Sequence, residues 1–367
     1  MQLPPHESIV DGDLELRPPR DEDIEPYVRA RADPLIGRFV GATGGPEDGR
    51  RWVAEALAAT DRREFAIAEN GAFVGVCRLY HVALDDGTGE IGYWVAPWGR
   101  GRRVATRATT ALTGWAFRHG LGRLEILARP DNPASHRVAL AAGYRGEGRR
   151  RGVEPGPDGY RCDLVAFARL ATDLPGPAPR RLPDLPDGRL TDGVIEVRPL
   201  VPGYAPEVRR LRLLPEVVAR SVPPEPRSPD KIDEVCAEAA GQWLAGERVE
   251  AAIVDAATGA LAGTIQLTGI EPPTGQAMIG YDLLPEWRRR GFATRAVTLL
   301  ARWAFEEVGL VRLIAGAATD NKASQRVLER AGFALEGCEL SRVPGPGGTR
   351  VDVFRYALLG GPAATGS

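Results

Sequence analysis

The chain has 367 residues, which at about 150 residues per domain predicts two or three domains. Hydrophobic residues make up 43% and charged residues 26%, so the chain can bury sizeable cores and is not disordered over its whole length. The 47 basic and 49 acidic residues give a net charge of −2. That balance argues against a dedicated nucleic-acid binder, because phosphate contacts require a basic surplus.

The cysteines, histidines and apolar segments exclude several further classes of protein. The four cysteines are far apart and the four histidines fall in no ligand spacing, so we expect no metal site and no disulfide framework. No apolar run approaches the ~18 residues that span a bilayer, and the N-terminal residues do not resemble a secretory signal. We therefore expect a cytoplasmic protein that binds neither membranes nor nucleic acid.

The first half of the chain alternates predicted strands and helices. A hairpin is predicted at 64–82 around the turn Asn70-Gly71, followed by a short strand at 90–96. From residue 104 the apolar residues recur with a helical period, and Gly120 ends this predicted helix. A strand at 124–128, a helix at 132–142 that begins with an asparagine, and a final hairpin complete the pattern.

The second half of the chain repeats the first. Residues 105–117, ATRATTALTGWAF, recur at 293–305 as ATRAVTLLARWAF, and residues 131–144 recur at 320–333. An offset near 188 residues is too long for a solenoid repeat, so two tandem copies of one domain are predicted. Each copy is expected to be an α/β (α+β) domain, with a mixed, mostly antiparallel sheet flanked by helices.

The predicted bounds are 1–172 for an N-terminal domain and 189–360 for a C-terminal domain, with a tail at 361–367. Prolines crowd the segment 173–188 between them. Because proline removes backbone donors and favours extended conformations, we expect a semi-rigid linker rather than a buried element. Two such domains in one chain would also be able to pair as an intrachain pseudo-dimer, in which each site borrows groups from the other.

A loop rich in glycine and arginine precedes the long helix in both copies. It reads RGRRVA at 100–105 and RRRGFA at 288–293. Backbone N–H groups and the helix dipole converge at such a helix N-terminus, which makes it a site for an anion. The alternative is a surface turn with solvated arginines, which the recurrence of the same strand–loop–helix context disfavours. Neither loop has the spacing of a dinucleotide-binding loop or a P-loop.

The segments IGYDLLPEWRRRGFATRAVTLLARWAF at 279–305 and DNKASQRVLERAGF at 320–333 resemble the GNAT superfamily of N-acetyltransferases. Within it, they are most similar to the ribosomal-protein-alanine (Rim-type) branch. The diphosphate loop of that family is [RQ]-x-x-G-x-[GA], which Arg288, Gly291 and Ala293 match. The resemblance runs through most of both copies and is weakest across 19–60 and 200–250. It implies acetyl-CoA as co-substrate, with no metal, and with the pantetheine along a splayed central strand.

The resemblance also assigns residues to the coenzyme site. In the C-terminal copy these are Leu283, Leu284, Arg288, Arg289, Arg290, Gly291, Phe292, Ala293, Thr294 and Asn321. In the N-terminal copy they are Arg100, Arg103, Ala105 and Asn132. Arg103 stands where the other copy has Gly291, and a side chain there risks filling space that the diphosphate needs. The C-terminal copy is therefore predicted to be the better coenzyme site.

The same resemblance makes Ser135 and Ser324 candidates for protonating the departing thiolate. Each follows an asparagine that the resemblance places on the pantetheine amide. The structural alternative is an ordinary helix N-cap, for which Asp-Asn followed by serine is well suited. Many members of the superfamily use a tyrosine seven residues after the asparagine, but Ala139 and Leu328 stand there.

Two glutamates of the N-terminal copy are candidates for the base. Glu90 opens the central strand, where Rim-type enzymes often place a carboxylate that takes the amine's proton, and its counterpart is Met278. Glu154 lies on the last hairpin, 19 residues after Ser135, and its counterpart is Val343. The alternative for each glutamate is a solvated surface charge.

The predicted function is transfer of an acetyl group from acetyl-CoA to a primary amine, by direct attack in a ternary complex. The acceptor is expected to be a small-molecule or peptide amine, but no pattern in the sequence identifies it. The alternative is a CoA-binding or scaffold protein with one or both sites decayed, because the motif residues are divided between the copies. A role of the arginines at 149–151 on nucleic acid or a membrane surface is disfavoured by the short cluster and the neutral overall charge.

Overall fold

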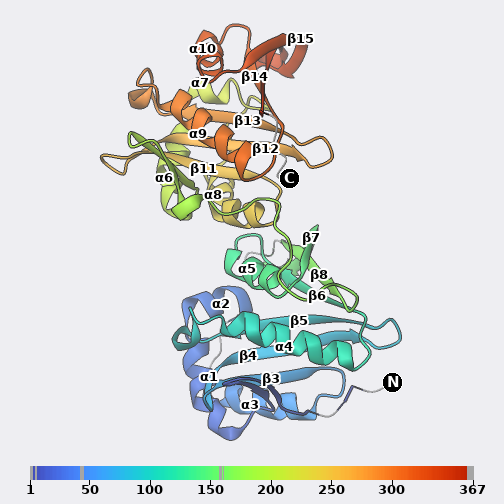
Figure 1. The fold of residues 1–367 in the computed structure, drawn as a ribbon. Coiled ribbons are helices and arrows are strands. Elements are labelled where there is room, and N and C mark those ends of the chain that lie inside the picture. Colours follow the sequence, from blue (N-terminus) through green and yellow to red (C-terminus); the bar gives the residue numbers. More distant parts are fainter. Residues whose placement is uncertain (1–2, 5, 42–44, 157–158, 160, 362–367) are drawn as a thin grey trace. The chain divides into compact units, whose positions relative to one another are not determined.

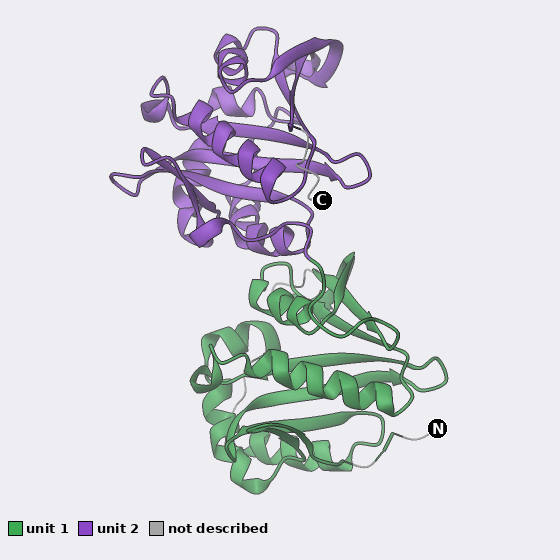
Figure 2. Cartoon of the chain, viewed as in Figure 1, with its two compact units in different colours: residues 1–179 green, residues 180–367 purple. Residues whose placement is uncertain are grey.

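The computed structural model describes residues 3–4, 6–41, 45–156, 159 and 161–361, so positions 362–367 of the predicted tail lie outside the described residues. The chain divides into two compact units, residues 1–179 and 180–367 (Figure 2), called here the N-terminal and C-terminal domains. Each contains an eight-stranded sheet with helices packed on it (Figure 1). The prediction of two tandem α/β domains is confirmed.

The sheet of the N-terminal domain has the order β1-β2-β3-β4-β5-β6-β8-β7 and is antiparallel except for the pair β5–β6. The strands are β1 Ile9–Asp11, β2 Leu14–Arg17, β3 Arg63–Glu69, β4 Ala72–Ala83, β5 Thr88–Val95, β6 Arg123–Ala128, β7 Arg145–Pro155 and β8 Arg161–Leu170. The helices are α1 Ile24–Arg31, α2 Pro34–Val40, α3 Pro46–Ala58, α4 Val104–Arg118 and α5 Pro133–Ala141. Tyr27 of α1 and Trp52 of α3 pack on one face of this sheet, and Trp115 of α4 contacts Phe65 on the other.

The sheet of the C-terminal domain repeats this topology, in the order β15-β16-β14-β13-β12-β11-β10-β9, with β13–β14 as the parallel pair. Its strands are β9 Leu190–Thr191, β10 Ile195–Pro199, β11 Val249–Asp255, β12 Leu261–Glu271, β13 Gln276–Leu283, β14 Arg312–Ala318, β15 Ala334–Pro344 and β16 Arg350–Leu359. Its helices are α6 Ala205–Arg212, α7 Pro215–Val218, α8 Pro229–Leu244, α9 Phe292–Glu306 and α10 Lys322–Arg330.

Local sequence signals explain the boundaries of these elements. The turn between β3 and β4 has Asn70 and Gly71 at positive φ, 51° and 81°, as a tight two-residue hairpin requires. The long helix α4 ends just before Gly120, which has a φ of 92°. In α9 the apolar stripe that includes Ala296, Leu300 and Trp303 is buried in the core of the C-terminal domain. The hairpin and both helices were predicted from these residues.

The proline-rich segment between the domains is partly buried, contrary to the expectation of an unburied linker. Ala178 is buried and donates its N–H to the carbonyl of Leu140 in α5 at 2.8 Å. Leu182 and Leu185 are buried in the core of the C-terminal domain, and the indole N–H of Trp243 donates to a carbonyl of this segment at 2.9 Å. Apolar residues between the prolines thus hold each end of the segment to the adjacent domain.

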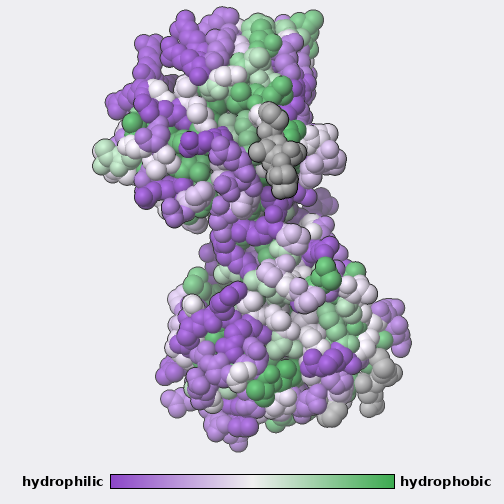
Figure 3. All heavy atoms as spheres, viewed as in Figure 1, coloured by the Kyte–Doolittle hydropathy of each residue, from purple (hydrophilic) through white to green (hydrophobic). Residues whose placement is uncertain are grey.

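Hydrophilic side chains cover most of the face drawn in Figure 3, in line with the large charged fraction of the chain. Within the described ranges, no helix is long and apolar enough to cross a membrane. The same residues contain no group of three or more His, Cys, Asp or Glu side chains placed to hold a metal ion.

A buried ion pair connects β2 to the start of α1 and gives a testable expectation for stability. The Nη1 and Nη2 groups of Arg17 donate to the two carboxylate oxygens of Asp23 at 2.7 and 2.8 Å, and both side chains are 2% exposed. Removing one partner leaves the other charge buried and uncompensated, so Asp23→Ala is expected to lower the free energy of unfolding by about 3–5 kcal/mol. Urea denaturation followed by circular dichroism measures this change.

The matched control for that experiment is the pair Arg50–Glu47, whose side chains are 58% and 82% exposed. Since solvent screens an exposed pair, Arg50→Ala is expected to cost less than about 1 kcal/mol. Equal losses for Asp23→Ala and Arg50→Ala would contradict the assignment of stability to the buried pair.

Candidate active site

The parallel strand pair opens in the middle of each sheet. In the N-terminal domain β5 and β6 pair only along Thr88–Glu90 and Arg123–Glu125, and in the C-terminal domain β13 and β14 pair only along Gln276–Met278 and Arg312–Ile314. Beyond these residues the described strands separate, which leaves backbone groups of Ile91–Val95 without a ladder partner on the β6 side. The resemblance places the pantetheine of the coenzyme in a gap of this kind.

The loop that leads into the long helix has the same backbone shape in both domains. The N-caps of α4 and α9 are Arg103 and Gly291, both left-handed with φ of 61° and 79°. Two residues earlier, Gly101 and Arg289 are also left-handed, with φ of 80° and 62°. At these two positions the N-terminal loop therefore has glycine and then arginine, whereas the C-terminal loop has arginine and then glycine. Neither helix has a side-chain cap, so N–H groups of its first turn point into the loop.

The loop has room within the protein for a side chain at the N-cap position, and obstruction of the diphosphate by Arg103 stays a prediction. A Cβ atom added at Gly291 would meet, among the described atoms, only the Nε of Arg295 at 3.9 Å. The arginine thus leaves the path of the backbone unchanged. Whether the C-terminal loop is the better coenzyme site stays a prediction.

A cavity of about 520 Å³ lies beside this loop in the N-terminal domain. It is bounded by the end of β5, the loop, the start of α5 and the helix α2. The cavity brings together predicted site residues that are far apart in the sequence, namely Arg100, Arg103, Ala105, Asn132 and Ser135. Its volume is in the range of sites that hold small molecules and cofactors.

The first arginine of each loop is anchored within the protein. The Nη2 group of Arg100 donates to Asp33 at 2.6 Å, and its Nε donates to the last carbonyl of β5 at 3.3 Å. The hydrogen bond from Arg100 lowers the pKa of the Asp33 carboxyl. Likewise, Arg288 donates to Glu216 at 2.8 Å and to the last carbonyl of β13 at 3.1 Å. These arginines tie the loop to the helix beside it, so they shape the site.

The other predicted residues of the C-terminal loop lie around the start of α9, with two exceptions. Leu284 has no exposed surface; its N–H donates to Ala262 at 2.9 Å and its carbonyl accepts from Trp287 at 3.0 Å. The side chain of Leu284 is therefore buried and both its backbone groups have partners within the protein, and its assignment to the coenzyme site stays a prediction. Arg290 lies over the ring of Trp287 at 5.0 Å. Arg289, Gly291, Phe292, Ala293 and Thr294 lie at the helix start, whereas Leu283 is the last residue of β13.

A tyrosine that sequence reasoning missed contacts the predicted serine of the N-terminal domain. The hydroxyl of Tyr93 on β5 lies 2.9 Å from the Oγ of Ser135 and 3.1 Å from its carbonyl oxygen. Asn132 caps α5, accepting a hydrogen bond from the N–H of Ser135 at 3.2 Å. Asn132 therefore acts as the N-cap of α5, and its hydrogen bond holds the serine beside the tyrosine.

The C-terminal domain repeats this arrangement. The hydroxyl of Tyr281 lies 2.9 Å from the Oγ of Ser324, and Asn321 accepts from the serine N–H at 3.2 Å. Burial raises the pKa of Tyr93 above its usual range and that of Tyr281 to about 12, so both phenols are protonated at neutral pH. The sequence signal for these tyrosines is the recurrence of Ile-Gly-Tyr at 91–93 and 279–281.

The side chain of Glu90 lies on the face of the sheet opposite to that of Tyr93. Because side chains alternate along a strand, Glu90 and Trp94 point to the side of α1 and α3, whereas Tyr93 points to the side of α5. Glu90 is the last residue of β5 that pairs with β6, and its side chain is 12% exposed. Its carboxylate accepts a hydrogen bond from Tyr80 and lies 3.1 Å from Nδ1 of His81.

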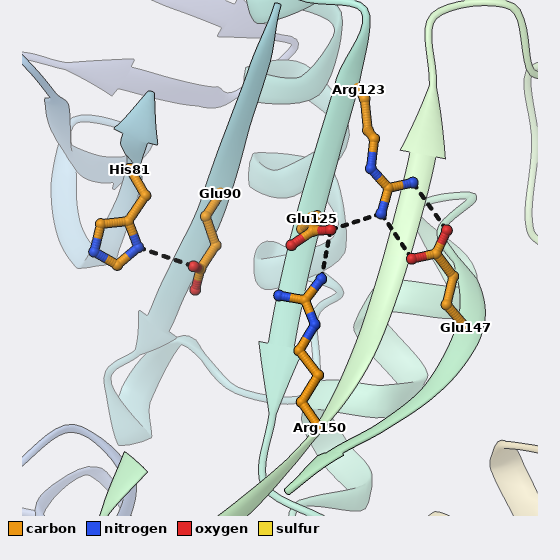
Figure 4. Close-up of polar contacts among 6 residues, drawn as sticks. All are labelled: His81, Glu90, Arg123, Glu125, Glu147 and Arg150. Atoms are coloured by element: carbon orange, nitrogen blue, oxygen red, sulfur yellow. Dashed lines mark hydrogen bonds and ion pairs between the residues drawn. The ribbon is translucent and has the colours of Figure 1, made fainter. Parts of the chain in front are cut away.

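A second carboxylate lies beside Glu90 but is neutralised by arginines (Figure 4). Glu125 of β6 is the register partner of Glu90, and Arg123 and Arg150 each donate to it at 2.6 Å. Burial raises the pKa of Glu125, but the hydrogen bonds from these arginines outweigh it and the net pKa is lowered. Arg123 also binds Glu147 at 2.7 Å. In the described part of the chain the partners of Glu90 are instead a phenol and an imidazole, so Glu90 is the carboxylate suited to receive a proton.

Glu154 is not brought into contact with these groups. It lies half-buried on β7, opposite Cys162 of β8, and no contact among the described residues joins it to Ser135 or Glu90. Its role as a base stays a prediction.

The equivalent face of the C-terminal domain is built differently. Met278 and Ile314 replace Glu90 and Glu125 at the point where the strands separate. Glu250 of β11, in register with Gln266 and Gly280, is a carboxylate on this face. It is 2% exposed, accepts from Arg248, and has one oxygen with no hydrogen-bond partner among the described residues. Burial raises the pKa of Glu250. No sequence signal separated this glutamate from an ordinary strand residue.

Comparison with known proteins identifies the family. Residues 13–145 and 195–334, one range in each domain, match the family model of the acetyltransferase (GNAT) domain. These ranges make up more than half of the chain. The chain therefore belongs to the GNAT acetyltransferase family, and the resemblance drawn from the loop and helix motifs is confirmed.

Individual relatives match over shorter stretches. YoaA of Bacillus subtilis, an uncharacterized N-acetyltransferase, is 35% identical over 99 residues, which are 27% of this chain and 55% of that protein. The ribosomal-protein-serine acetyltransferase of Escherichia coli is 33% identical over 107 residues, 29% of this chain and 59% of that protein. The chain thus spans little more than half the length of these curated relatives.

Among solved structures, RimL, a ribosomal L7/L12 alpha-N-protein acetyltransferase in complex with Coenzyme A, is similar at 23% identity and a TM-score of 0.41. The match covers 45% of this chain and 98% of that one.

Proposed function

We propose that this protein transfers an acetyl group from acetyl-CoA to a primary amine in the cytoplasm, and that its N-terminal domain holds the complete site. The observation that carries the proposal is the gap between β5 and β6. A loop and a cavity of about 520 Å³ lie beside the far end of this gap, and Glu90 lies at the point where the two strands begin to separate. Membership of the GNAT family supports the donor, and the separate positions of the cavity and Glu90 support a ternary complex of donor and acceptor.

The residues present fit acetyl-CoA. The diphosphate is a dianion, and the first turn of α4 offers backbone N–H groups that no side chain caps. Arg103 adds positive charge at the same helix end, while Arg100 holds the loop through Asp33. The pantetheine would follow Ile91–Val95, whose backbone groups on the β6 side lack ladder partners. The thioester then lies in the gap, between Ser135 and Glu90.

Attack by the neutral amine forms the new N–C bond and breaks the C–S bond. Glu90 receives the proton that the amine nitrogen loses, and a backbone N–H of β5 stabilises the oxyanion. Ser135 donates a hydrogen bond to the departing thiolate. Loss of a proton near neutral pH costs about 4 kcal/mol for a lysine amine of pKa ~10.4, but under about 1 kcal/mol for an α-amine of pKa ~7.7–8.0. An α-amine is thus the less demanding acceptor for a site with one carboxylate.

The C-terminal domain is proposed to bind coenzyme through the loop that matches the family motif, Arg288 to Ala293. Its serine and tyrosine are in place, but Met278 stands where the base lies in the other domain. This division supports a second candidate for the C-terminal domain, that of a coenzyme-binding module without turnover. The acceptor of the N-terminal domain, a small-molecule or peptide amine, would enter on the side of α1, α2 and α3.

Thiol release from acetyl-CoA, measured with a panel of α-amines, lysine amines and small-molecule amines, tests the proposed function. We expect thiol release that depends on the amine, and calorimetric binding of two coenzyme molecules per chain. Coenzyme binding without thiol release for any amine would favour the CoA-binding alternative. Absence of coenzyme binding to either domain would overturn both.

A further inference from the structure

His81 has a backbone conformation that favours glycine. Its φ is 48°, in the left-handed region, at a place where the pairing of β4 with β5 is interrupted between Tyr80 and Ala83. The C-terminal domain has the same interruption, and the residue at the equivalent position is Gly269, with a φ of 55°. The fold therefore needs a left-handed residue here, and glycine meets this need without strain. The N-terminal domain carries a histidine instead.

The histidine side chain joins a half-buried carboxylate to solvent. Nδ1 of His81 lies 3.1 Å from the Oε2 of Glu90, as Figure 4 shows. The His81 side chain is 76% exposed, whereas that of Glu90 is 12% exposed. The phenol of Tyr80 donates to the same carboxylate, and its ring lies 4.6 Å from the imidazole. An imidazole in this place connects the carboxylate with bulk water.

The two domains differ at all three positions of this cluster together. Where the N-terminal domain has Tyr80, His81 and Glu90, the C-terminal domain has Thr268, Gly269 and Met278. The strained histidine thus occurs in the domain that carries the carboxylate, and glycine occurs in the domain that lacks it. If His81 only shaped the bend in the strand, its presence would have no physical link to the presence of Glu90.

We propose that His81 is the proton relay of the N-terminal site, an inference that rests on the proposed acetyl transfer with Glu90 as base. The amine's proton moves to the Glu90 carboxylate as the N–C bond forms and the C–S bond breaks. In the resting site the Nδ1–H of neutral His81 donates to the charged carboxylate. Once Glu90 is protonated, exchange with solvent moves the imidazole proton to Nε2, and Nδ1 then accepts the carboxyl proton to give an imidazolium. His81 releases the Nε2 proton to water or buffer, which leaves Glu90 charged and Nδ1–H facing it for the next turnover.

The variant that tests this relay is His81→Gly, which installs the residue that the C-terminal domain has on the same backbone. Because glycine relieves the strain at this φ, the thermal denaturation midpoint is expected to be unchanged or raised. The turnover rate in dilute, weakly buffering solution is expected to fall about tenfold, a loss below the 10²–10⁴ range of a whole general base since Glu90 remains. Added imidazole is expected to restore much of the rate, and to leave the wild-type rate unchanged.

The matched control is Asn70→Gly, which relieves a left-handed residue with a φ of 51° at the β3–β4 turn. It is expected to change stability in the same direction, with no effect on turnover and no response to imidazole. A His81→Gly rate equal to wild type in dilute buffer, or a loss that imidazole does not restore, would overturn the relay.

Glu90→Gln, measured beside these variants, separates the relay from the proposed function. If Glu90→Gln abolishes turnover while His81→Gly leaves it intact, the base stands and the relay fails. If the wild-type chain releases no thiol with any amine, the proposed function fails, and the relay fails with it.

Discussion

Glu90→Gln is expected to lower the rate of amine-dependent thiol release by about 10²–10⁴, the contribution of a positioned general base. The amide has nearly the volume of the carboxylate and still accepts a hydrogen bond from Tyr80, but it does not accept the amine's proton. Coenzyme binding is expected to be unchanged, because Glu90 lies where the strands begin to separate and does not line the cavity beside the coenzyme loop. Steady-state kinetics and calorimetry on the same preparation check both expectations.

Glu147→Gln is the matched control for this substitution. Glu147 also carries its charge close to the gap, but it is exposed and bound to Arg123. Its removal is expected to change the rate by less than about threefold, since an exposed ion pair contributes little free energy. A rate for Glu90→Gln within that same range would show that another group, or water alone, removes the proton.

The fold followed from the sequence because its signals are local and occur twice. Hairpin turns such as Asn70-Gly71, the helical period after Val104 and the asparagine before α5 each act over a few residues. The repeat near 188 residues then ruled out a single large domain. The burial of Leu182 and Leu185 was missed because a proline-rich composition says nothing about the two apolar side chains within it.

Only part of the candidate site could be predicted from the sequence, because its contacts join residues that are far apart in the chain. The resemblance predicted Glu90 and Ser135 as site residues, but Tyr93 contacts Ser135 across 42 residues, and no local pattern predicts such a contact. The strain at His81 appears only in the backbone angle. The resemblance assigned Leu284 to the coenzyme site, and no local pattern indicated that its side chain is buried.

Ser135→Ala is expected to lower the rate by about 10- to 150-fold, the effect of losing one hydrogen bond of about 1.5–3 kcal/mol to a charged group. In the proposed reaction the serine acts by hydrogen bonding rather than by relaying a proton from the tyrosine. Burial raises the pKa of the equivalent tyrosine, Tyr281, to about 12. Transfer of its proton to a thiolate of ordinary pKa ~8.5 would then be uphill by about 5 kcal/mol. In the proposed reaction the tyrosine is thus a positioning residue.

Tyr93→Phe shows whether the tyrosine acts through the serine. The phenol has one proton and two oxygens of Ser135 within reach, at 2.9 and 3.1 Å. When it donates to Oγ, the serine's own proton is directed to the sulfur, and without the phenol that proton is free to turn elsewhere. We expect Tyr93→Phe to lower the turnover rate by about three- to tenfold, which is less than the effect of losing one hydrogen bond to a charged group. The double variant Tyr93→Phe/Ser135→Ala is expected to match Ser135→Ala alone, because the tyrosine has no serine hydroxyl left to orient.

Tyr144→Phe controls for the loss of a buried phenol hydroxyl in the same domain. Tyr144 lies 2.6 Å from the hydroxyl of Thr113, and both side chains are fully buried. Its substitution is expected to lower stability by about 1 kcal/mol, as the loss of one hydrogen bond does, with an unchanged turnover rate.

If the losses from Tyr93→Phe and Ser135→Ala instead multiply in the double variant, the tyrosine stabilises the thiolate independently of the serine. If Ser324→Ala lowers the rate and Ser135→Ala does not, the reaction belongs to the C-terminal domain, where no carboxylate occupies the place of Glu90.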